Sequence, residues 1–352
     1  HPISNNTFYN LNEDQIQDYI NKFYEVAKEE IEKLNPDIIH AQHLWITPYV
    51  ASKFNIPYVV TAHGTDLKGF VKDDRYHKYA LEGAKKADRI ITISKQVDRE
   101  VTELYGISEN KELIMNGYDE NLFVKHDKPP AEIFEKFGID KKTDHVVSFV
   151  GKLTRFKGID VLLDACSIYE EKLNGNVTTI IAGNGELKDE LLKQSKDLGL
   201  ENVKFLGHVD QKELVDLYNL ADVSAVPSRT EPFGLVAVEA LACGTPVVGT
   251  KQGGLPDFII PSVGTLVPVE NHKALAKAII DEIFHENKKK RAKDCYEYAL
   301  KHFSWKKSLE KLEEVYSEVI WLKISVVIPT YWGRKESVGW KEGDFVYDHP
   351  TP

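Results

Sequence analysis

Residues 222–244 read DVSAVPSRTEPFGLVAVEALACG, and this stretch decides the fold. It begins with a short apolar strand at 222–226, continues through a polar turn, and ends in an apolar helix that Gly244 stops. A buried strand followed by a helix is the repeating unit of parallel α/β sheets. This order predicts Glu231 in the loop, the backbone amides of residues 233–235 at the start of the helix, and Glu239 inside it.

The two glutamates lie on either side of that helix start, eight positions apart. Free N–H groups and the positive end of the helix dipole favour a phosphate there, and carboxylates accept hydrogen bonds from sugar or ribose hydroxyls. A glycosidase acid–base pair needs carboxyl groups roughly 5 to 9.5 Å apart, whereas eight helical residues span about 12 Å. The stretch therefore predicts a nucleotide-sugar site, with chance spacing in an acidic chain as the alternative.

The same alternation of strand and helix runs along most of the chain, which predicts an α/β fold with parallel sheets. We expect two Rossmann-like domains connected by the loop at 119–131, which is rich in Asp, Lys and Pro. The expected strands are 37–41, 58–61, 89–93, 145–150, 177–182, 203–206, 223–226 and 246–249. The expected helices are 11–34, 159–172, 235–243, 273–285, 288–302 and 305–322.

The amino-acid composition indicates which class of protein this is and which partners are unfavourable. The 352 residues are 42% hydrophobic and 28% charged, as is typical of a globular protein, and the net charge of −10 argues against nucleic acid and anionic membranes as partners. No apolar run reaches the length of a membrane span, so we expect no transmembrane segment. The three cysteines lack the spacing of a disulfide framework or a zinc site, which favours a cytoplasmic location.

Residues 151–158, GKLTRFKG, link the strand at 145–150 to the next helix and carry three cations. Positive charge at such a turn suits a diphosphate, and a lysine ammonium can follow negative charge that develops on a leaving group. The order of residues does not match a Walker loop. The turn is therefore a candidate diphosphate site, and a solvated basic turn is the alternative.

Two glycine-rich turns and one histidine follow predicted strands. The turn at 183–185 lacks the third glycine of a dinucleotide fingerprint, which predicts a tight turn that approaches a ligand or packs closely. The glycines at 253 and 254 permit close approach of the backbone to a ligand. His63 comes just past a strand, where ligand clefts lie in α/β folds, and can donate to a sugar oxygen. A histidine satisfied by local backbone groups is the alternative.

Several other histidines and charged residues are expected to have structural roles rather than a part in binding or catalysis. His40 and His43 lie close in sequence, but no acidic or cysteine partner is nearby, so they do not predict a metal site. We expect His40 to point into the sheet region. Asp88, Asp98 and the basic run at 288–291 are expected on solvated helix faces.

Together these motifs resemble the retaining nucleotide-sugar glycosyltransferases of family 4. The matching segments are PDIIH (36–40), TAHG (61–64), VGKLTRFKG (150–158), AGNG (182–185), FLG (205–207), PSRTEPFGLVAVEALACGTPVV (227–248), GGLPD (253–257) and FSW (303–305). The resemblance implies the GT-B fold, in which two Rossmann-like domains face a cleft. It implies transfer of a sugar from a nucleoside-diphosphate sugar to an acceptor hydroxyl with retention and without a metal or other cofactor, the leaving phosphate accepting the proton.

The resemblance also implies a role for each residue that matches a motif of the family. Glu239 would bind the ribose hydroxyls of the donor, Glu231 a hydroxyl of the transferred sugar, and His63 the same sugar from the other domain. Lys152 and Lys157 would neutralise the departing diphosphate. His63, Lys157 and Glu231 are thus the expected catalytic residues. The donor site would be completed by Gly151, Gly183, His208, Val209, Phe233, Gly234 and Leu235.

The sequence departs from the family pattern in three places. Lys152 stands where arginine is more frequent, so charge is kept but bidentate phosphate binding is lost. Asp257 stands where glutamate is usual. Family members begin with a first strand, a glycine-rich loop and further strand–helix units, and nothing before Pro36 resembles these. We therefore expect an incomplete N-terminal domain, whose open sheet edge would favour self-association.

The end of the chain resembles a different type of sugar transferase. Residues 324–331, ISVVIPTY, are similar to the opening strand of the family 2 glycosyltransferases, which have the GT-A fold. The expected division is a partial N-terminal domain at 1–140, a donor-binding domain at 141–303, a helix at 304–322 that crosses back to the N-terminal domain, and a fragment of a following unit at 323–352.

Three alternative functions stay open at this point. The chain could be a non-catalytic nucleotide-sugar-binding fragment of a larger, bifunctional glycosyltransferase, because acceptor contacts would be missing. It could be a GT-B epimerase or phosphorylase, although no lysine site for pyridoxal phosphate is identifiable. An NAD dehydrogenase is a distant third. The donor sugar and its base are not specified, and the acceptor could be a sugar, a glycan, a lipid-linked molecule or a small molecule.

Overall fold

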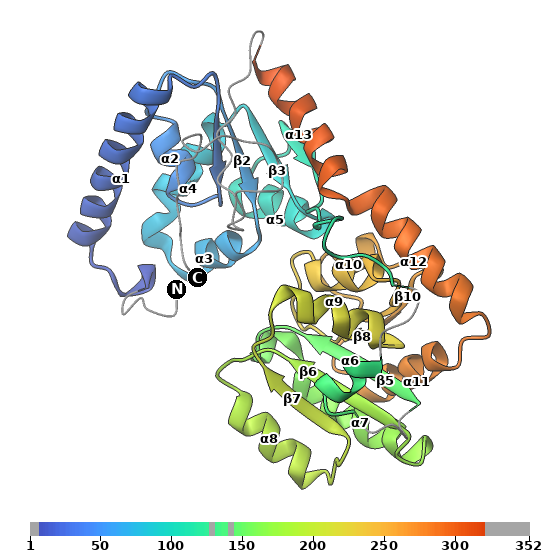
Figure 1. Ribbon diagram of the computed structural model, residues 1–352. Helices are drawn as coiled ribbons and strands as arrows, with labels where there is room; N and C mark the ends of the chain where they lie inside the picture. Colours follow the sequence, from blue (N-terminus) through green and yellow to red (C-terminus); the bar gives the residue numbers. More distant parts are fainter. Residues whose placement is uncertain (1–6, 127–130, 140–143, 321–352) are drawn as a thin grey trace. The chain divides into compact units, whose positions relative to one another are not determined.

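The computed structural model describes residues 7–126, 131–139 and 144–320, and the chain divides into two compact units. The first unit comprises the residues up to Ile114 and those from Leu309 onward, and the second comprises Met115–Ser308. The segment at 323–352, expected to begin a following unit, lies outside the described residues. In the described part of the chain each unit contains one sheet, and both sheets are parallel (Figure 1).

The first unit has a four-stranded sheet in the order β1-β2-β3-β4. Its strands are β1 (Ile39–Gln42), β2 (Tyr58–Ala62), β3 (Arg89–Thr92) and β4 (Lys111–Leu113). The predicted strands at 37–41, 58–61 and 89–93 are confirmed to within two residues. β4 was not predicted, because it is only three residues long and none of its side chains is fully buried.

The first long helix of this unit begins and ends at recognisable capping residues. Asn12 and Gln15 form a capping box at the start of α1, with both hydrogen bonds at 2.9 Å, and Asn35 ends that helix with a left-handed φ of 45°. The helices are α1 (Glu13–Leu34), α2 (Thr47–Ala51), α3 (Thr65–Lys72), α4 (His77–Lys86) and α5 (Lys95–Tyr105). Within the same unit, Val315 and Tyr316 of α13 (Trp305–Val319) pack in a buried cluster with residues of the sheet.

The second unit has a six-stranded parallel sheet in the order β10-β9-β8-β5-β6-β7. The strands are β5 (His145–Val150), β6 (Val177–Ala182), β7 (Val203–Gly207), β8 (Val223–Val226), β9 (Val247–Thr250) and β10 (Gly264–Val267). From β5 the chain proceeds outward to β7, then returns to β8 beside β5 and proceeds in the opposite direction. The strand order therefore reverses between β5 and β8, which is the position where doubly wound sheets bind ligands.

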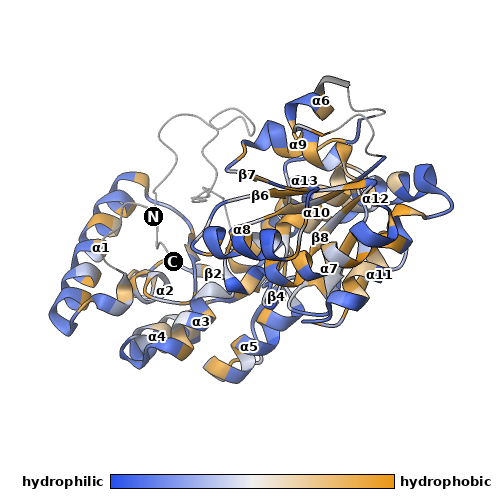
Figure 2. Ribbon diagram, turned by 90° about the horizontal axis from the view of Figure 1, so that it is seen from below, coloured by the Kyte–Doolittle hydropathy of each residue, from blue (hydrophilic) through white to orange (hydrophobic). Residues whose placement is uncertain are grey.

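Helices cover both faces of this second sheet. One face packs against α7 (Ile159–Lys172), α8 (Lys188–Asp197) and α11 (His272–Ile283). The other packs against α6 (Ala131–Lys136) and α9 (Gln211–Leu220), and α10 (Leu235–Ala242) lies beside α9 and α12 (Lys288–Phe303). Hydrophobic residues gather along the strands between these helices (Figure 2). The predicted fold, two α/β domains with parallel sheets, is confirmed.

One expectation for this unit is wrong in part. The basic run at 288–291 was expected on a solvated face, and Lys288, Lys289 and Lys290 are indeed exposed. Arg291 is instead only 7% exposed and forms an ion pair with Glu282, which is 4% exposed, at 2.5 Å. The helical turn rotates this fourth position inward, where Arg291 also donates to the carbonyl oxygen of Pro261.

Arg291→Leu should be strongly destabilising, because it leaves the carboxylate of Glu282 buried without a cation. We expect a loss of about 3–5 kcal/mol in the free energy of unfolding, measured by urea denaturation. The double variant R291L/E282L should recover most of that loss, because neither charge then needs a partner. Lys290→Leu is the control, since its pair with Asp294 is exposed and should contribute at most about 1 kcal/mol. A double variant as unstable as R291L would contradict this interpretation.

Candidate functional site

The loops that follow β5 and β8 form the centre of the candidate site. β5 and β8 are neighbours, with Val147 paired to Val223 and Ser148 to Ser224. Because both strands run in the same direction, their carboxyl ends meet at one edge of the sheet. The loop after β5 includes the short helix η3 (Arg155–Lys157), and the loop after β8 carries Glu231. The fold therefore brings together two motifs that are far apart in sequence.

Lys157 and Glu231 form an ion pair across these two loops. The ammonium of Lys157 lies 2.6 Å from Oε2 of Glu231, and the hydroxyl of Ser228 donates to the same oxygen at 3.1 Å. The Glu231 side chain is 8% exposed and that of Lys157 is 27% exposed. A buried carboxylate requires such compensation. Within the described residues, Oε1 of Glu231 has no hydrogen-bond partner, so one oxygen remains able to accept from a ligand.

The backbone of Glu231 is fixed by the glycine turn after β9. The amide of Gly254 donates to the carbonyl oxygen of Glu231 at 2.8 Å. At Gly253 the φ angle is +67°, and a Cβ atom there would lie only 1.7 Å from that oxygen. A side chain at Gly253 would collide with the backbone of Glu231, and one at Gly254 would lie 2.8 Å from Cα of Phe233. Both positions therefore require glycine because the protein's own backbone passes so close. The sequence predicted that the backbone of this turn lies close to a ligand. In the structure the backbone of the turn lies against the loop that carries Glu231.

The start of α10 lies next to Glu231 and has backbone amides that no intrahelical bond uses. Within the described residues, the amides of Phe233, Gly234 and Leu235 donate to no acceptor. Gly234 precedes the helix with a φ of +103°. The ring of Phe233 is buried against Phe258 at 5.4 Å, so only its backbone is available to a ligand. Free amides at a helix start bind anions, phosphate in particular.

Glu239 lies further along α10 and is 8% exposed. Its Oε2 accepts a hydrogen bond from the buried hydroxyl of Tyr218 at 3.3 Å. Burial raises the pKa of Glu239 to about 8, although the Tyr218 hydrogen bond acts in the opposite direction. Its second oxygen, Oε1, has no hydrogen-bond partner in the described part of the chain. Glu231 and Glu239 therefore differ: one carboxylate is paired with a cation, and the other is not.

The remaining predicted donor residues occupy the neighbouring loops of the same sheet edge. Gly183 has a φ of +143°, and a Cβ atom there would lie 1.8 Å from the carbonyl oxygen of Gly151, so the close packing expected of this turn is confirmed. The amide of Gly183 donates to Gly207 at 2.7 Å, directly before His208. The loops after β5, β6 and β7 are thus in contact. Lys152 and His208 are exposed, and Val209 is half-buried.

His63 belongs to the first unit, where it follows β2. Its Nε2 lies 2.7 Å from Oε1 of Gln42, and its amide donates to the buried carboxylate of Asp66. Burial lowers the pKa of His63 to about 4, and the nearby His43 contributes in the same direction. The imidazole is therefore neutral at neutral pH. A neutral imidazole can exchange hydrogen bonds with a hydroxyl but has no charge to offer an anion.

The sequence interpretation missed the position of His43. Its ring lies 4.6 Å from that of His63 between centroids, and its backbone has a left-handed φ of 67°, which is unusual for a residue other than glycine. The signal that would have found it is topological, since β1 and β2 are adjacent and parallel and each ends next to one of these histidines. His40 is buried in the sheet as predicted, between Tyr316 and Thr61.

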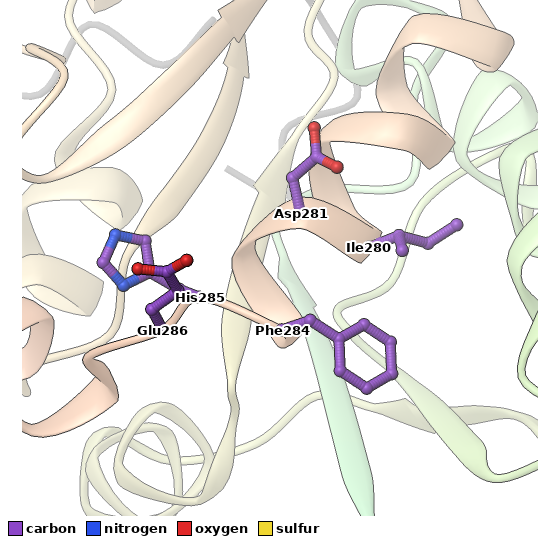
Figure 3. A pocket seen from close by; sticks show the side chains of 5 residues that line it. All are labelled: Ile280, Asp281, Phe284, His285 and Glu286. Atoms are coloured by element: carbon purple, nitrogen blue, oxygen red, sulfur yellow. The ribbon is translucent and has the colours of Figure 1, made fainter.

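A hollow at the end of α11 is not part of this arrangement. Figure 3 shows its side chains, with the Phe284 ring directed away from those of His285 and Glu286. Phe284 contacts His145 edge-on at 5.3 Å, and His145 is the first residue of β5. The hollow is therefore at the amino end of the strand, opposite to the edge that carries Lys157.

In the described ranges, no group of three or more His, Cys, Asp or Glu side chains is arranged to hold a metal ion. None of the helices that the structure describes is both long and apolar enough to cross a membrane.

Two family models match the chain. The model described as "Glycosyl transferases group 1" matches residues 131–302, and the model described as "Glycosyltransferase Family 4" matches residues 8–122. A protein of Methanocaldococcus jannaschii named as an uncharacterized glycosyltransferase is 34% identical over a match of 298 positions, and the match covers 80% of this chain and 75% of that protein. The D-inositol 3-phosphate glycosyltransferase of Corynebacterium aurimucosum is 32% identical over a match of 322 positions, and the match covers 85% of this chain and 75% of that enzyme.

Solved structures agree with these relatives. The structure of HepE from Anabaena in complex with UDP-glucose has a TM-score of 0.72 at 27% identity, and the match covers 83% of this chain and 82% of that one. Sucrose-phosphate synthase from Thermosynechococcus elongatus has the same TM-score at 25% identity, over 88% of this chain and 80% of that one. The chain therefore belongs to the group 1, family 4 glycosyltransferases and is a glycosyltransferase of the GT-B type.

Proposed function

We propose that this glycosyltransferase moves a sugar from a nucleoside-diphosphate sugar to an acceptor hydroxyl with retention and without a metal. The observation that carries the proposal is the Lys157–Glu231 ion pair beside the open amides of α10, where the strand order of the second sheet reverses. A cation, free N–H donors and a carboxylate oxygen meet the needs of a phosphate and a sugar hydroxyl. The solved HepE complex with UDP-glucose supports this substrate class.

The proposed roles follow the chemistry of each group. The free oxygen of Glu231 would accept from a hydroxyl of the transferred sugar, and the amides at 233–235 would hold sugar and distal phosphate. Glu239 would accept from the ribose hydroxyls. His63 is proposed to contact the sugar as a neutral hydrogen-bonding group. The nucleotide would be completed by Gly151, Lys152, Lys157, Gly183, His208 and Val209.

The proposed reaction needs no side-chain nucleophile. The bond between the anomeric carbon and the phosphate oxygen breaks, the bond to the acceptor oxygen forms on the same face, and the leaving phosphate takes the acceptor's proton. Negative charge grows on the diphosphate as this occurs, and Lys157 with the helix start is positioned to stabilise it. Glu231 is assigned a hydrogen-bonding role, because Oε2 is engaged by Lys157 and Ser228 and Oε1 would accept from the sugar hydroxyl.

We also propose a cytoplasmic location, which the three cysteines support because all of them are buried free thiols in the structure.

Binding of UDP or GDP should strengthen as the pH rises from about 7 to about 9. Burial raises the pKa of Glu239 to about 8, so its carboxyl group is mostly protonated below that pH. Ribose hydroxyls donate best to the carboxylate form, and nucleotide binding below pH 8 must therefore release a proton from Glu239. Calorimetry at several pH values measures this. Glu239→Gln should weaken binding at high pH and remove the pH dependence. Equal affinity of the variant and the parent chain at every pH would contradict the assignment of Glu239.

Lys157→Met should lower kcat far more than it weakens nucleotide binding, because its charge is needed most as the diphosphate leaves. We expect a fall of about 100-fold or more, measured as nucleoside diphosphate released. The double variant K157M/E231Q avoids an unpaired buried carboxylate and should stay inactive while folding normally. Lys277→Met, which removes an exposed cation of α11, is the matched control. An unchanged kcat in K157M would remove Lys157 from the mechanism.

A further inference from the structure

Arg229 lies two residues before Glu231 and has no part in the reaction described above. Its side chain is only 16% exposed. It donates to both carboxylate oxygens of Asp160 at 2.7 Å, and to the carbonyl oxygen of Arg155 at 2.7 Å. It also donates through Nη2 to Glu270 at 2.9 Å and through Nε to the other oxygen of that carboxylate.

These contacts use the whole hydrogen-bonding capacity of the guanidinium. An arginine has five N–H donors, and here they meet two carboxylates and one carbonyl oxygen. Both carboxylates are engaged bidentately, which is the strongest and most directional way for arginine to pair. No donor is left for a phosphate. Arg229 is therefore not a substrate ligand, although it lies in the loop that carries Glu231.

What Arg229 does hold is the short helix that contains Lys157. Asp160 is in the first turn of α7, three residues after Lys157, and Arg155 begins η3. The backbone amide of Arg229 adds a hydrogen bond to the carbonyl oxygen of Phe156 at 2.8 Å. Arg229 thus binds residues both before and after Lys157 in the sequence.

The second carboxylate comes from a residue in an unfavourable backbone conformation. Glu270 follows β10 with a φ of +62°, a region that residues other than glycine rarely occupy. Its side chain is 56% exposed, so the ion pair contributes little to stability by itself. The Arg229 guanidinium lowers the pKa of Glu270, which stays ionised near neutral pH. Backbone conformations that cost stability, such as that of Glu270, concentrate at functional sites.

We propose that Arg229 is a positioning residue, which fixes the Lys157 loop against the Glu231 loop so that the ammonium and the carboxylate are held in place for the donor diphosphate. The proposal rests on the proposed function of Lys157 and Glu231. Asp160 and Glu270 orient the guanidinium, and Arg229 acts on the substrate only through Lys157.

The test is a double-mutant cycle between Arg229 and Lys157, measured on kcat and on UDP or GDP affinity. Arg229→Lys keeps the charge but cannot form the bidentate contacts. In the parent chain it should lower kcat about tenfold or more, whereas in a Lys157→Met background the further loss should be less than about twofold. An equal loss in both backgrounds would overturn the proposal, because Arg229 would then act independently of Lys157. An unchanged kcat in R229K would also overturn it.

A second variant separates positioning from stability. Glu270→Gly relieves the left-handed φ and removes an exposed partner, so the melting temperature should be unchanged or higher. The proposal expects kcat to fall nonetheless, and a normal kcat in E270G would count against it. Arg89→Lys, at a surface arginine paired with Glu318, is the control and should leave kcat unchanged. If the parent chain binds neither nucleotide, the proposed function itself fails; if it binds and the cycle is additive, only this inference fails.

Discussion

The 2.6 Å ion pair between Lys157 and Glu231 is the interaction on which the site depends. A carboxylate as buried as Glu231 is costly unless a cation and hydrogen bonds compensate it. Lys157 can reach it only because the sheet places the ends of β5 and β8 side by side. Neighbouring residues hold the two loops that carry this ion pair. Gly253 and Gly254 fix the Glu231 backbone, and Arg229 connects the two loops.

In the proposed mechanism, the ammonium of Lys157 is held beside Glu231 by the fold itself, so little reorganisation would be needed when negative charge develops on a leaving diphosphate. Among the residues that the structure describes, one oxygen of Glu231 is engaged by side chains, and the amides of residues 233–235 donate to no acceptor. A donor would therefore add contacts to the site without dismantling the ion pair.

The sequence predicted much of this, because periodicity and turn residues reveal strand–loop–helix units locally. β5, β6, β8 and α7 were predicted to the residue. The polar strand β4 lacks that signal. The inward turn of Arg291 and the contact between His43 and His63 depend on tertiary packing. The pairing of Arg229 with Glu270 joins residues 41 positions apart, and no local pattern indicates such a partner.

Hydrogen–deuterium exchange of the chain with and without UDP or GDP tests the central claim most directly. If the nucleotide binds at the paired loops, exchange should slow in the segments 151–158 and 231–239, because the open amides at the start of α10 become occupied. The hollow at 280–286 should not respond. Nucleotide binding with no protection in the two loop segments, or with protection only at 280–286, would contradict the location of the site.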